Sequence, residues 1–291
     1  MNSLKKYPYL FIGPAMVLLI LFFILPIVVA LGISFTDMDL VGLNDYSAVN
    51  FIGFDNYKAI FQDSEFGQVI LNTLFYVVVG VPLVVACSLT IATAINFVSG
   101  RIGEAFRGIY YLPAITNTVA VSFVWMFLYN PSHGLINYFL MNLHIIDSQI
   151  AWLSDPAYAK FALIILAVWK GIGLNMIILL AGLTAISKDY YEAADIDGAN
   201  AFQKYFKITL PQLKYPLFFV IVTTTIGWMQ FFDEVYMMIE RESANAKSIA
   251  LFIYEHGFKM MDYGYASAAS IVLFIGIITI TIIQLKVSKE N

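Results

Sequence analysis

Six long apolar stretches divide the chain, and polar segments of varying length separate them. The stretches cover residues 10–34, 69–97, 108–132, 161–187, 215–236 and 263–285. A helix needs roughly 20 apolar residues to cross about 30 Å of hydrocarbon. Membrane-spanning β-strands would be shorter and would alternate apolar with polar positions. The pattern therefore predicts an all-α polytopic membrane protein with six transmembrane helices, in one domain over 10–285 between short termini at 1–9 and 286–291.

Composition supports a membrane protein. The chain is 60% hydrophobic and 12% charged, whereas soluble chains have about 45–50% apolar and about 25% charged residues. Lys5 and Lys6 precede the first apolar stretch as in a signal peptide, but that stretch is too long and lacks a clean cleavage site, so we expect a retained helix. The net charge of −4 argues against a nucleic-acid partner. Membrane lipid is the expected surrounding.

Basic residues in the loops predict the orientation, because cytoplasmic loops carry an excess of Lys and Arg. One side has ten of them: Lys5, Lys6, Arg101, Arg107, Lys188, Lys204, Lys207, Lys214, Lys286 and Lys289. The other side has five: Lys58, Lys160, Arg241, Lys247 and Lys259. We therefore expect both termini in the cytoplasm and the loops near 35–68, 130–160 and 238–262 outside.

The cytoplasmic loop over 187–214 is longer than a simple connection and is patterned as a helical unit. Ser187 is suited to cap a helix start, and Gly198 to end that helix in a left-handed conformation. A second short amphipathic segment follows, and Pro211 is expected to close it before the next span. Glu192, Asp195 and Ala199 would share one face if the first helix continued that far. On periodicity alone, an ordinary interfacial loop remains an alternative.

The residues of this loop resemble the "EAA" signature of bacterial ABC importer permeases. The match comprises Glu192-Ala-Ala194, Asp197-Gly-Ala199, and then Ile208, Leu210 and Pro211. It lies between the fourth and fifth of six spans on the predicted cytoplasmic side, as in that family. The resemblance implies that the loop forms a coupling helix, which docks into a cleft of an ATPase subunit, and that the chain has the type I importer permease fold in a bacterial cytoplasmic membrane.

Further segments resemble the maltose and glycerol-phosphate branch of these sugar-importer permeases and cover most of 10–285. They are Phe51-Ile-Gly-Phe-Asp-Asn-Tyr57, Phe106-Arg107, Tyr110-Tyr-Leu-Pro113, Asn130-Pro131, Gly134-Leu-Ile-Asn137, Ala181-Gly-Leu183 and Tyr263-Gly-Tyr-Ala-Ser267. The chain departs from the branch after the fifth span, where Ile239-Glu-Arg-Glu-Ser243 replaces a frequent Gly-Gly-Pro turn. That departure concerns receptor docking or substrate gating rather than coupling to ATP.

The resemblance also implies a set of partners: a second permease subunit, an ABC ATPase dimer and an extracellular or periplasmic solute-binding protein. The chain has no G-x-x-x-x-G-K-[ST] phosphate loop. We therefore expect no enzyme activity and no bound cofactor on this chain, with ATP and Mg²⁺ held by the ATPase subunits. The residues expected to contact the ATPase are Glu192, Ala193, Ala194, Asp195, Asp197, Gly198 and Ala199.

Polar and aromatic residues within the spans are candidates for a substrate pathway, since polar groups in lipid are costly and aromatic faces suit sugars. The candidates are Asn117, Trp125, Lys170, Asn175, Trp228, Gln230, Phe232 and Asp233. Amides would hydrogen-bond sugar hydroxyls, and aromatic rings would offer flat faces. Each aromatic has the alternative of lipid contact or packing, and Lys170 that of a structural pair with a carboxylate or with helix carbonyls.

Two other functions remain open. The first is an ABC importer for another solute, such as an amino acid, a polyamine, phosphate or a glycerol-phosphate ester. Lys170 is the only basic residue inside a predicted span, which favours a neutral sugar over an anionic cargo. The second is a stand-alone secondary transporter or channel, which would show broken helices in matching repeats or a ring of charges. The sequence shows no convincing internal repeat.

Overall fold

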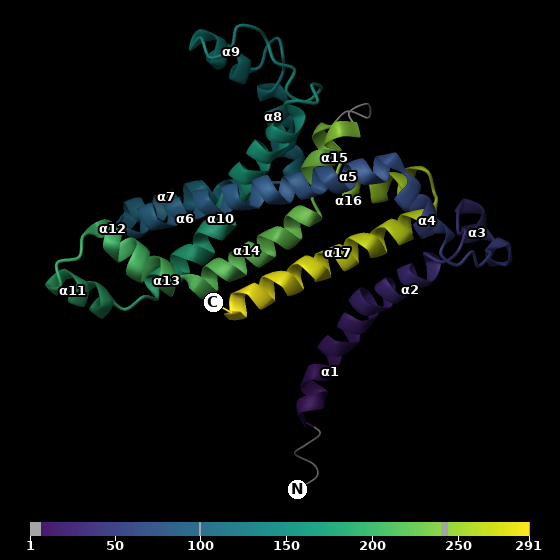
Figure 1. Ribbon diagram of the computed structural model, residues 1–291, viewed down its shortest axis with the longest axis horizontal. Coiled ribbons are helices and arrows are strands. Elements are labelled where there is room, and N and C mark those ends of the chain that lie inside the picture. Colours follow the sequence, from purple (N-terminus) through teal and green to yellow (C-terminus); the bar gives the residue numbers. More distant parts are fainter. Residues whose placement is uncertain (1–6, 99, 240–243, 291) are drawn as a thin grey trace. The chain divides into compact units, whose positions relative to one another are not determined.

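The computed structural model describes residues 7–98, 100–239 and 244–290, and this part of the chain is built of helices without a strand. One isolated bridge joins Thr36 and Phe51. Helices satisfy their own backbone groups, which lipid requires of a spanning segment. The helices before the fourth long stretch (Figure 1) are α1 (Tyr7–Leu19), η1 (Ile20–Ile24), α2 (Leu25–Ile33), α3 (Leu40–Asn44), η2 (Tyr46–Ala48), α4 (Asp55–Gln62), α5 (Ser64–Phe75), η3 (Tyr76–Gly80), α6 (Val81–Asn96), α7 (Gly100–Ile115), α8 (Thr118–Leu128) and α9 (Leu135–Asn142).

The remaining helices begin with α10, the central helix of the larger unit described below. They are α10 (Ala159–Thr184), α11 (Lys188–Ile196), α12 (Ala201–Lys204), η4 (Tyr205–Thr209), α13 (Leu210–Gln212), α14 (Lys214–Met229), α15 (Asp233–Met238), η5 (Ala244–Ala246), α16 (Ile249–Tyr254), η6 (Glu255–Lys259) and α17 (Tyr263–Glu290). Lys5, Lys6 and the segment 240–243, with Arg241, lie outside the described residues, and so does most of the departure from the family pattern after the fifth span.

The chain forms two compact units. The first takes residues 1–67 and 252–278, and the second takes 68–251 and 279–291. In the first unit, the buried side chain of Asn56 donates to the backbone oxygens of Ser34 at 3.0 Å and Thr36 at 2.8 Å. The Gly264 N–H, at the start of α17, donates to the Met38 oxygen at 2.8 Å. These bonds fix the segment that follows α2 against α4 and the start of α17.

The second unit is organised around α10, which packs between α6 and α7 and also contacts α14 (Figure 1). Much of α10 is buried, including Leu163, Leu166, Met176 and Leu179. The contact with α7 is close because Gly173 has no side chain: a Cβ there would come within 2.4 Å of the Tyr110 oxygen. The core of this unit therefore depends on small residues that let helices approach, as is typical of helix pairs in membranes.

Within the described residues, five helices are long and apolar enough to cross a membrane by length and composition. They span Phe11–Ile33, Ser64–Asn96, Ala159–Thr184, Lys214–Met238 and Tyr263–Ser288, and they overlap five of the six predicted stretches. The last part of Lys214–Met238 is not continuous, since α14 ends at Met229 and α15 begins at Asp233.

The third predicted span, 108–132, is not one straight helix. It corresponds to the pair α7 and α8, which meet at a bend of 96°, and a sixth span exists only if this pair counts as one. Pro113 lies in the last turn of α7, and Asn117 leaves the helical conformation (φ −57, ψ 126) to cap α8. The apolar composition of the stretch did not reveal this break, although Pro and Asn are the local residues that produce it.

Candidate functional site: a coupling hairpin and a polar cleft

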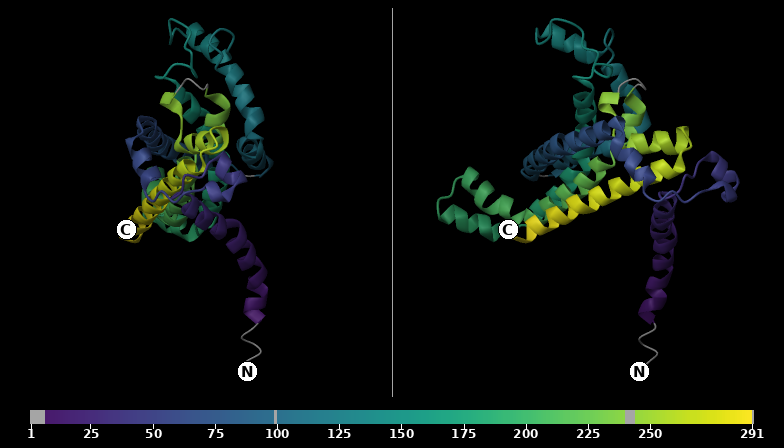
Figure 2. Two further views of the ribbon diagram at one scale, coloured as in Figure 1. Left: turned by 90° about the vertical axis from the view of Figure 1, so that its right-hand side faces the viewer. Right: turned by 45° about the vertical axis from the view of Figure 1, so that its right-hand side comes forward.

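The segment after α10 is a hairpin of two short helices, α11 and α12, that extends past the end of α10 (Figure 2). The Ser187 hydroxyl accepts the Asp189 N–H at 3.2 Å and caps α11, which confirms the predicted start. Gly198 is left-handed, with φ +73, which confirms the predicted end. The Ala199 N–H donates to the Ala194 oxygen at 2.9 Å and the Gly198 N–H to the Asp195 oxygen at 3.1 Å. This is the Schellman arrangement that satisfies the last carbonyls of a helix.

The structure settles two further details of the predicted loop. Helix α11 ends at Ile196, so the condition for Ala199 to share the face of Glu192 and Asp195 is not met. Gly198 reverses the chain before that position is reached. The second segment does not end at Pro211 either, because η4 and α13 carry the helix through it to Gln212. Pro211 follows the π-helical turn η4 almost directly, and the helix breaks at Leu213 instead.

Three side-chain contacts make the hairpin a connected body. Lys204 on α12 forms an ion pair with Asp195 on α11. The Tyr191 hydroxyl lies 2.9 Å from the Thr209 hydroxyl in η4. Asn200 and Gln203 cap α12 reciprocally, each side chain accepting the other residue's backbone N–H at 2.9 Å. The helical path then runs through η4 and α13 to Leu213, directly before α14, so α11 is connected to a long apolar helix.

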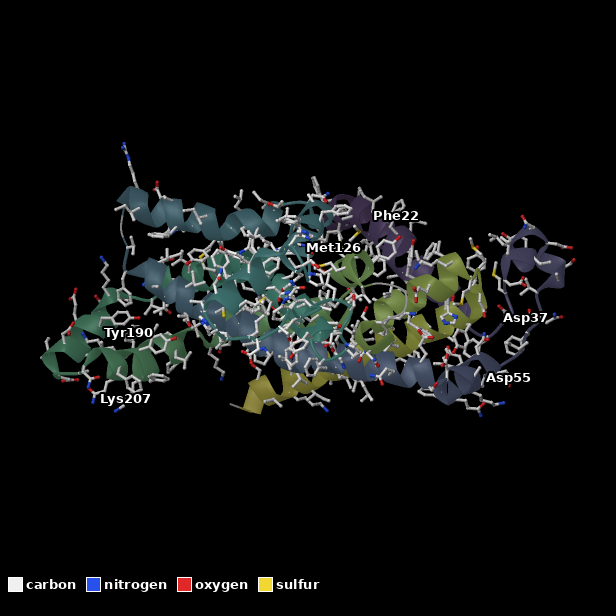
Figure 3. The ribbon with its side chains drawn as sticks, turned by 90° about the horizontal axis from the view of Figure 1, so that it is seen from above. Phe22, Asp37, Asp55, Met126, Tyr190 and Lys207 are labelled. Atoms are coloured by element: carbon white, nitrogen blue, oxygen red, sulfur yellow. The ribbon has the colours of Figure 1, made fainter. Side chains whose placement is uncertain are left out.

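Five of the seven predicted contact residues are exposed on the outside of this hairpin. Glu192, Ala193, Asp195, Asp197 and Gly198 are exposed, Ala199 is half-buried, and Ala194 is buried. The large apolar side chains of Ile196, Phe202 and Phe206 are exposed as well, and Figure 3 places Tyr190 and Lys207 at the same end of the unit. An acidic helix beside exposed apolar side chains is a surface of the kind that binds another protein.

A second feature is an open cleft of about 360 Å³ in the second unit, formed by α7, α10, α14, Phe231 and α15. Its lining residues are Ala114, Ala167, Lys170, Gly171, Leu174, Asn175, Thr223, Thr224, Gly227, Trp228, Phe231 and Glu234. Three of the predicted pathway residues are among them, namely Lys170, Asn175 and Trp228. The cleft therefore combines a charged end, a polar wall of amide and hydroxyl groups, and an aromatic wall.

The charged end of the cleft is an ion pair. The Lys170 ammonium donates to the Glu234 carboxylate at 3.0 Å and to the hydroxyl of Thr118. The side chains of Lys170 and Glu234 are 19% and 11% exposed. Thr118 is the first residue of α8, and Glu234 is the second of α15. One ammonium on α10 thus holds the starts of both helices that follow a break.

The other two walls hold polar and aromatic side chains that are mostly buried. The Thr224 hydroxyl donates to the Asn175 side-chain oxygen over 3.4 Å. Trp228 stacks on Phe231 with ring centroids 5.4 Å apart and fills the space beside Gly80 in η3.

The five other predicted pathway residues do not line the cleft. Asn117 uses its side-chain oxygen to accept the Val119 N–H at 2.9 Å. Trp125 packs on Tyr129 and Trp169, and Phe232 stacks on Tyr236. Gln230 and Asp233 are exposed at the break between α14 and α15.

Sequence reasoning missed Glu234, Phe231 and the threonines of α14. Asp233 and Glu234 are adjacent acids at a helix start, and nothing local distinguishes the one that turns inward. The threonines at 223–225 carried a signal, since three hydroxyls within an apolar stretch are unusual. In the described ranges, no group of three or more His, Cys, Asp or Glu residues could hold a metal ion.

Comparisons with known proteins agree with this architecture. Residues 59–289 match the family model described as "Binding-protein-dependent transport system inner membrane component". The lactose transport system permease protein LacF of Rhizobium radiobacter is 33% identical, over 100% of this chain and 98% of LacF. The trehalose/maltose transport system permease protein MalF of Thermococcus litoralis is 34% identical, over 98% and 94%. The arabinooligosaccharides transport system permease protein AraP of Bacillus subtilis is 31% identical, over 98% and 90%.

Two solved structures of bacterial alginate ABC transporters contain chains with the same fold. One, in complex with an alginate pentasaccharide-bound periplasmic protein, gives a TM-score of 0.82 at 24% identity over 99% of this chain and 96% of that chain. The other gives 0.79 at 22% identity, over 99% and 97%. With the family match over most of its length, the chain is a multi-pass membrane protein and a transport subunit rather than an enzyme, and it belongs to the inner membrane components of binding-protein-dependent ABC importers.

Proposed function

We propose that this chain forms one half of the translocation pathway of an importer for a neutral sugar or oligosaccharide, with a second permease subunit forming the other half. The names of the relatives, for lactose, trehalose/maltose and arabinooligosaccharides, support this class of cargo. The cleft supports it too, because amide and hydroxyl groups suit sugar hydroxyls, and Trp228 and Phe231 add apolar aromatic surface to its lining.

The observation that carries the coupling role is the exposed, doubly capped helix α11. In this proposal α11 docks into a cleft of a cytoplasmic ATPase dimer that binds ATP and Mg²⁺, with Glu192, Ala193, Asp195 and Asp197 at the contact and the buried Ala194 packed behind them. Gly198 and Ala199 hold its end through the Schellman bonds. Closure of the ATPases would move α11, and the Asp195–Lys204 and Tyr191–Thr209 contacts would pass that motion to α14. ATP then biases a two-state membrane element by binding one state better.

The orientation follows from charge. Basic residues on the coupling hairpin (Lys188, Lys204 and Lys207) and in the first half of α7 (Arg101 and Arg107) support a cytoplasmic position for this end, because cytoplasmic segments carry an excess of positive charge. Both termini lie on that side as well in this proposal. A solute-binding protein would deliver cargo at the opposite ends of the spans, near loops 35–68, 130–160 and 238–262.

Co-purification of a tagged chain with its co-expressed partners tests the coupling role. Wild type is expected to retain a second permease and an ATPase in mild detergent. Glu192→Lys should keep the permease and lose the ATPase, since it reverses a charge at the proposed contact. Asp147→Lys is the matched control: it makes a similar charge reversal at an exposed position away from α11 and should retain both partners.

Uptake into proteoliposomes tests the cargo. The complete assembly, with its solute-binding protein, is expected to accumulate a labelled neutral disaccharide only when ATP is enclosed with the ATPase. If the purified chain transports solute driven by an ion gradient and without the ATPase, the ABC importer proposal is contradicted and a secondary transporter is favoured. If the complete assembly imports only charged solutes, the proposal of a neutral sugar as cargo is contradicted.

A further inference from the structure

We propose that Lys170 and Glu234 form a charge-selecting pair, which makes the cleft accept neutral polyhydroxylated cargo and reject both anions and cations. This inference rests on the proposed function, since it concerns how the same cleft chooses its cargo. The two residues are the only charged ones among those lining the cleft, and their charges cancel. An importer for an acidic sugar would instead need an uncompensated cation at this position.

The pair is placed to act on cargo rather than only on the fold. A purely structural pair would be expected within the packed interior, whereas both of these side chains line the cleft and keep 19% and 11% of their surface exposed. This partial desolvation strengthens their field, because charges interact more strongly where water is scarce. Removing one partner leaves the other uncompensated, and that charge then attracts an opposite charge from the cargo.

The hydrogen-bonding capacity of the pair matches a sugar diol. An ammonium has three N–H donors, and the contacts in the described part of the chain use two, toward Thr118 and Glu234. The Lys170 bond falls on one oxygen of Glu234, and the second oxygen remains an acceptor. One donor beside one acceptor suits two neighbouring hydroxyls, of which one accepts and the other donates.

The aromatic wall completes the subsite. Trp228 and Phe231 stack almost in parallel, with an interplanar angle of 20°, and both line the cleft with the ion pair. A sugar ring has hydroxyls along its edge and apolar C–H groups on its face. It can therefore meet the ion pair with its hydroxyls and the apolar ring atoms of the aromatic wall with its C–H groups, without bringing any charge into the cleft.

The test measures binding to the permease pair with its ATPase in nanodiscs, without the solute-binding protein, so that the cleft alone discriminates. The labelled probes are lactose, trehalose and maltose, each beside the uronate obtained by oxidising one primary hydroxyl to a carboxylate. Wild type is expected to bind a neutral sugar at least about tenfold more tightly than its uronate. Glu234→Gln should shift this ratio by about tenfold or more toward the uronate, because Lys170 is then uncompensated.

Three further variants make the result specific. Glu234→Asp keeps the charge and should keep the wild-type ratio. The double variant Lys170→Gln/Glu234→Gln restores a neutral cleft and should do the same. Lys170→Gln alone should instead favour a disaccharide that carries a free amino group, and it tests the proposal even where Glu234→Gln fails to assemble.

The outcomes separate the two proposals. One outcome is that wild type imports a neutral disaccharide in the uptake assay while Glu234→Gln and Lys170→Gln keep the wild-type binding ratios. This outcome would overturn the charge selection and leave the proposed function intact. Wild type that imports none of these sugars would contradict the proposed function itself.

Discussion

The indole ring of Trp228 occupies the space that a side chain at position 80 would need. A Cβ added to Gly80 would lie 1.8 Å from Trp228 Cζ3. Gly80 ends η3, and Trp228 lies near the end of α14 and lines the cleft. The absence of a side chain on one helix thus positions an aromatic wall on another.

Gly80→Ala is therefore expected to displace Trp228 and to lower the free energy of unfolding by about 1–3 kcal/mol, the usual effect of overpacking. A thermal melt of the purified complex measures it. Gly108→Ala is the control, since nothing lies within 4 Å of a Cβ there. If Gly80→Ala and Gly108→Ala both have the melting temperature of wild type, the close contact with Gly80 does not position Trp228.

Gly173→Ala should be at least as destabilising, for a different reason. A Cβ at Gly173 would meet the backbone of α7, 2.4 Å from the Tyr110 oxygen, and a backbone cannot rotate away as a side chain can. Gly171→Ala on the same helix meets only Val84 Cγ2 at 3.1 Å. We expect a loss of about 1–3 kcal/mol or more for Gly173→Ala and a smaller one for Gly171→Ala. Equal melting temperatures for the two variants would contradict the close contact of α7 and α10.

Substitutions at Gly198 test the effect of backbone conformation alone, because an added side chain has room there. Its φ is +73, and nothing lies within 4 Å of an added Cβ. Gly198→Ala should thus lower stability only by the cost of placing a side chain in the left-handed conformation, about 1–2 kcal/mol. Gly198→Asn should cost less, since Asn adopts this conformation more readily. In co-purification we expect ATPase retention to fall in the order Gly, Asn, Ala, Val. Retention by Gly198→Val equal to wild type would show that the end of α11 need not be fixed.

Asn137 holds together the loop that follows α8. Its buried side chain donates to the Pro131 oxygen at 3.0 Å and the Ile150 oxygen at 2.9 Å, and it accepts the Trp152 ring N–H at 2.8 Å. Asn137→Leu leaves these groups unsatisfied, at about 1–3 kcal/mol for each that stays buried. Hydrogen exchange should therefore quicken over residues 145–155. Asn142→Leu, at an exposed position of the same helix, should leave that exchange unchanged.

The burial of His256 leads us to expect that the first unit becomes less stable at acidic pH. Burial lowers its pKa from 6.5, and this outweighs the opposing effect of Asp262, Glu65, Asp63 and Glu255. The folded chain then binds this proton less tightly than the unfolded chain does. Stability should fall as the pH drops below about 6.5, until the folded pKa is passed, and it should not change through this group above that range.

Melting temperatures measured between about pH 5 and pH 8 test this, because the loss follows the protonation of a single group. His256→Gln should flatten the curve on its acidic side, whereas the exposed His133→Gln should follow wild type. Asp37 acts in the same direction at lower pH: the hydrogen bonds from Asn50 lower its pKa, so its contribution is lost as the pH falls through that lowered value.

The features that could be predicted from sequence are those that depend on neighbours in the chain. The Ser187 cap and the left-handed Gly198 follow from residues only a few positions apart. The bend after α7 also has a local signal, Pro113 and Asn117, but it was missed because the span was predicted from apolar composition alone. The partner of Lys170 was missed because Glu234 lies 64 residues further along the chain, and only helix packing brings the two together.

Two of the spanning helices contain a π-helical turn, η1 in the first span and η3 in the second, and such a turn changes the phase of the helix. Such a turn holds one residue more than an α-helical turn, and one residue rotates a helix by about 100°. In the helix formed by α5, η3 and α6, the turn at Tyr76–Gly80 therefore separates two stretches whose lipid-facing positions are out of step. A cysteine scan of labelling along residues 64–96 should then fit two periodic curves offset at this turn, and a single period of 3.6 residues should fail beyond it.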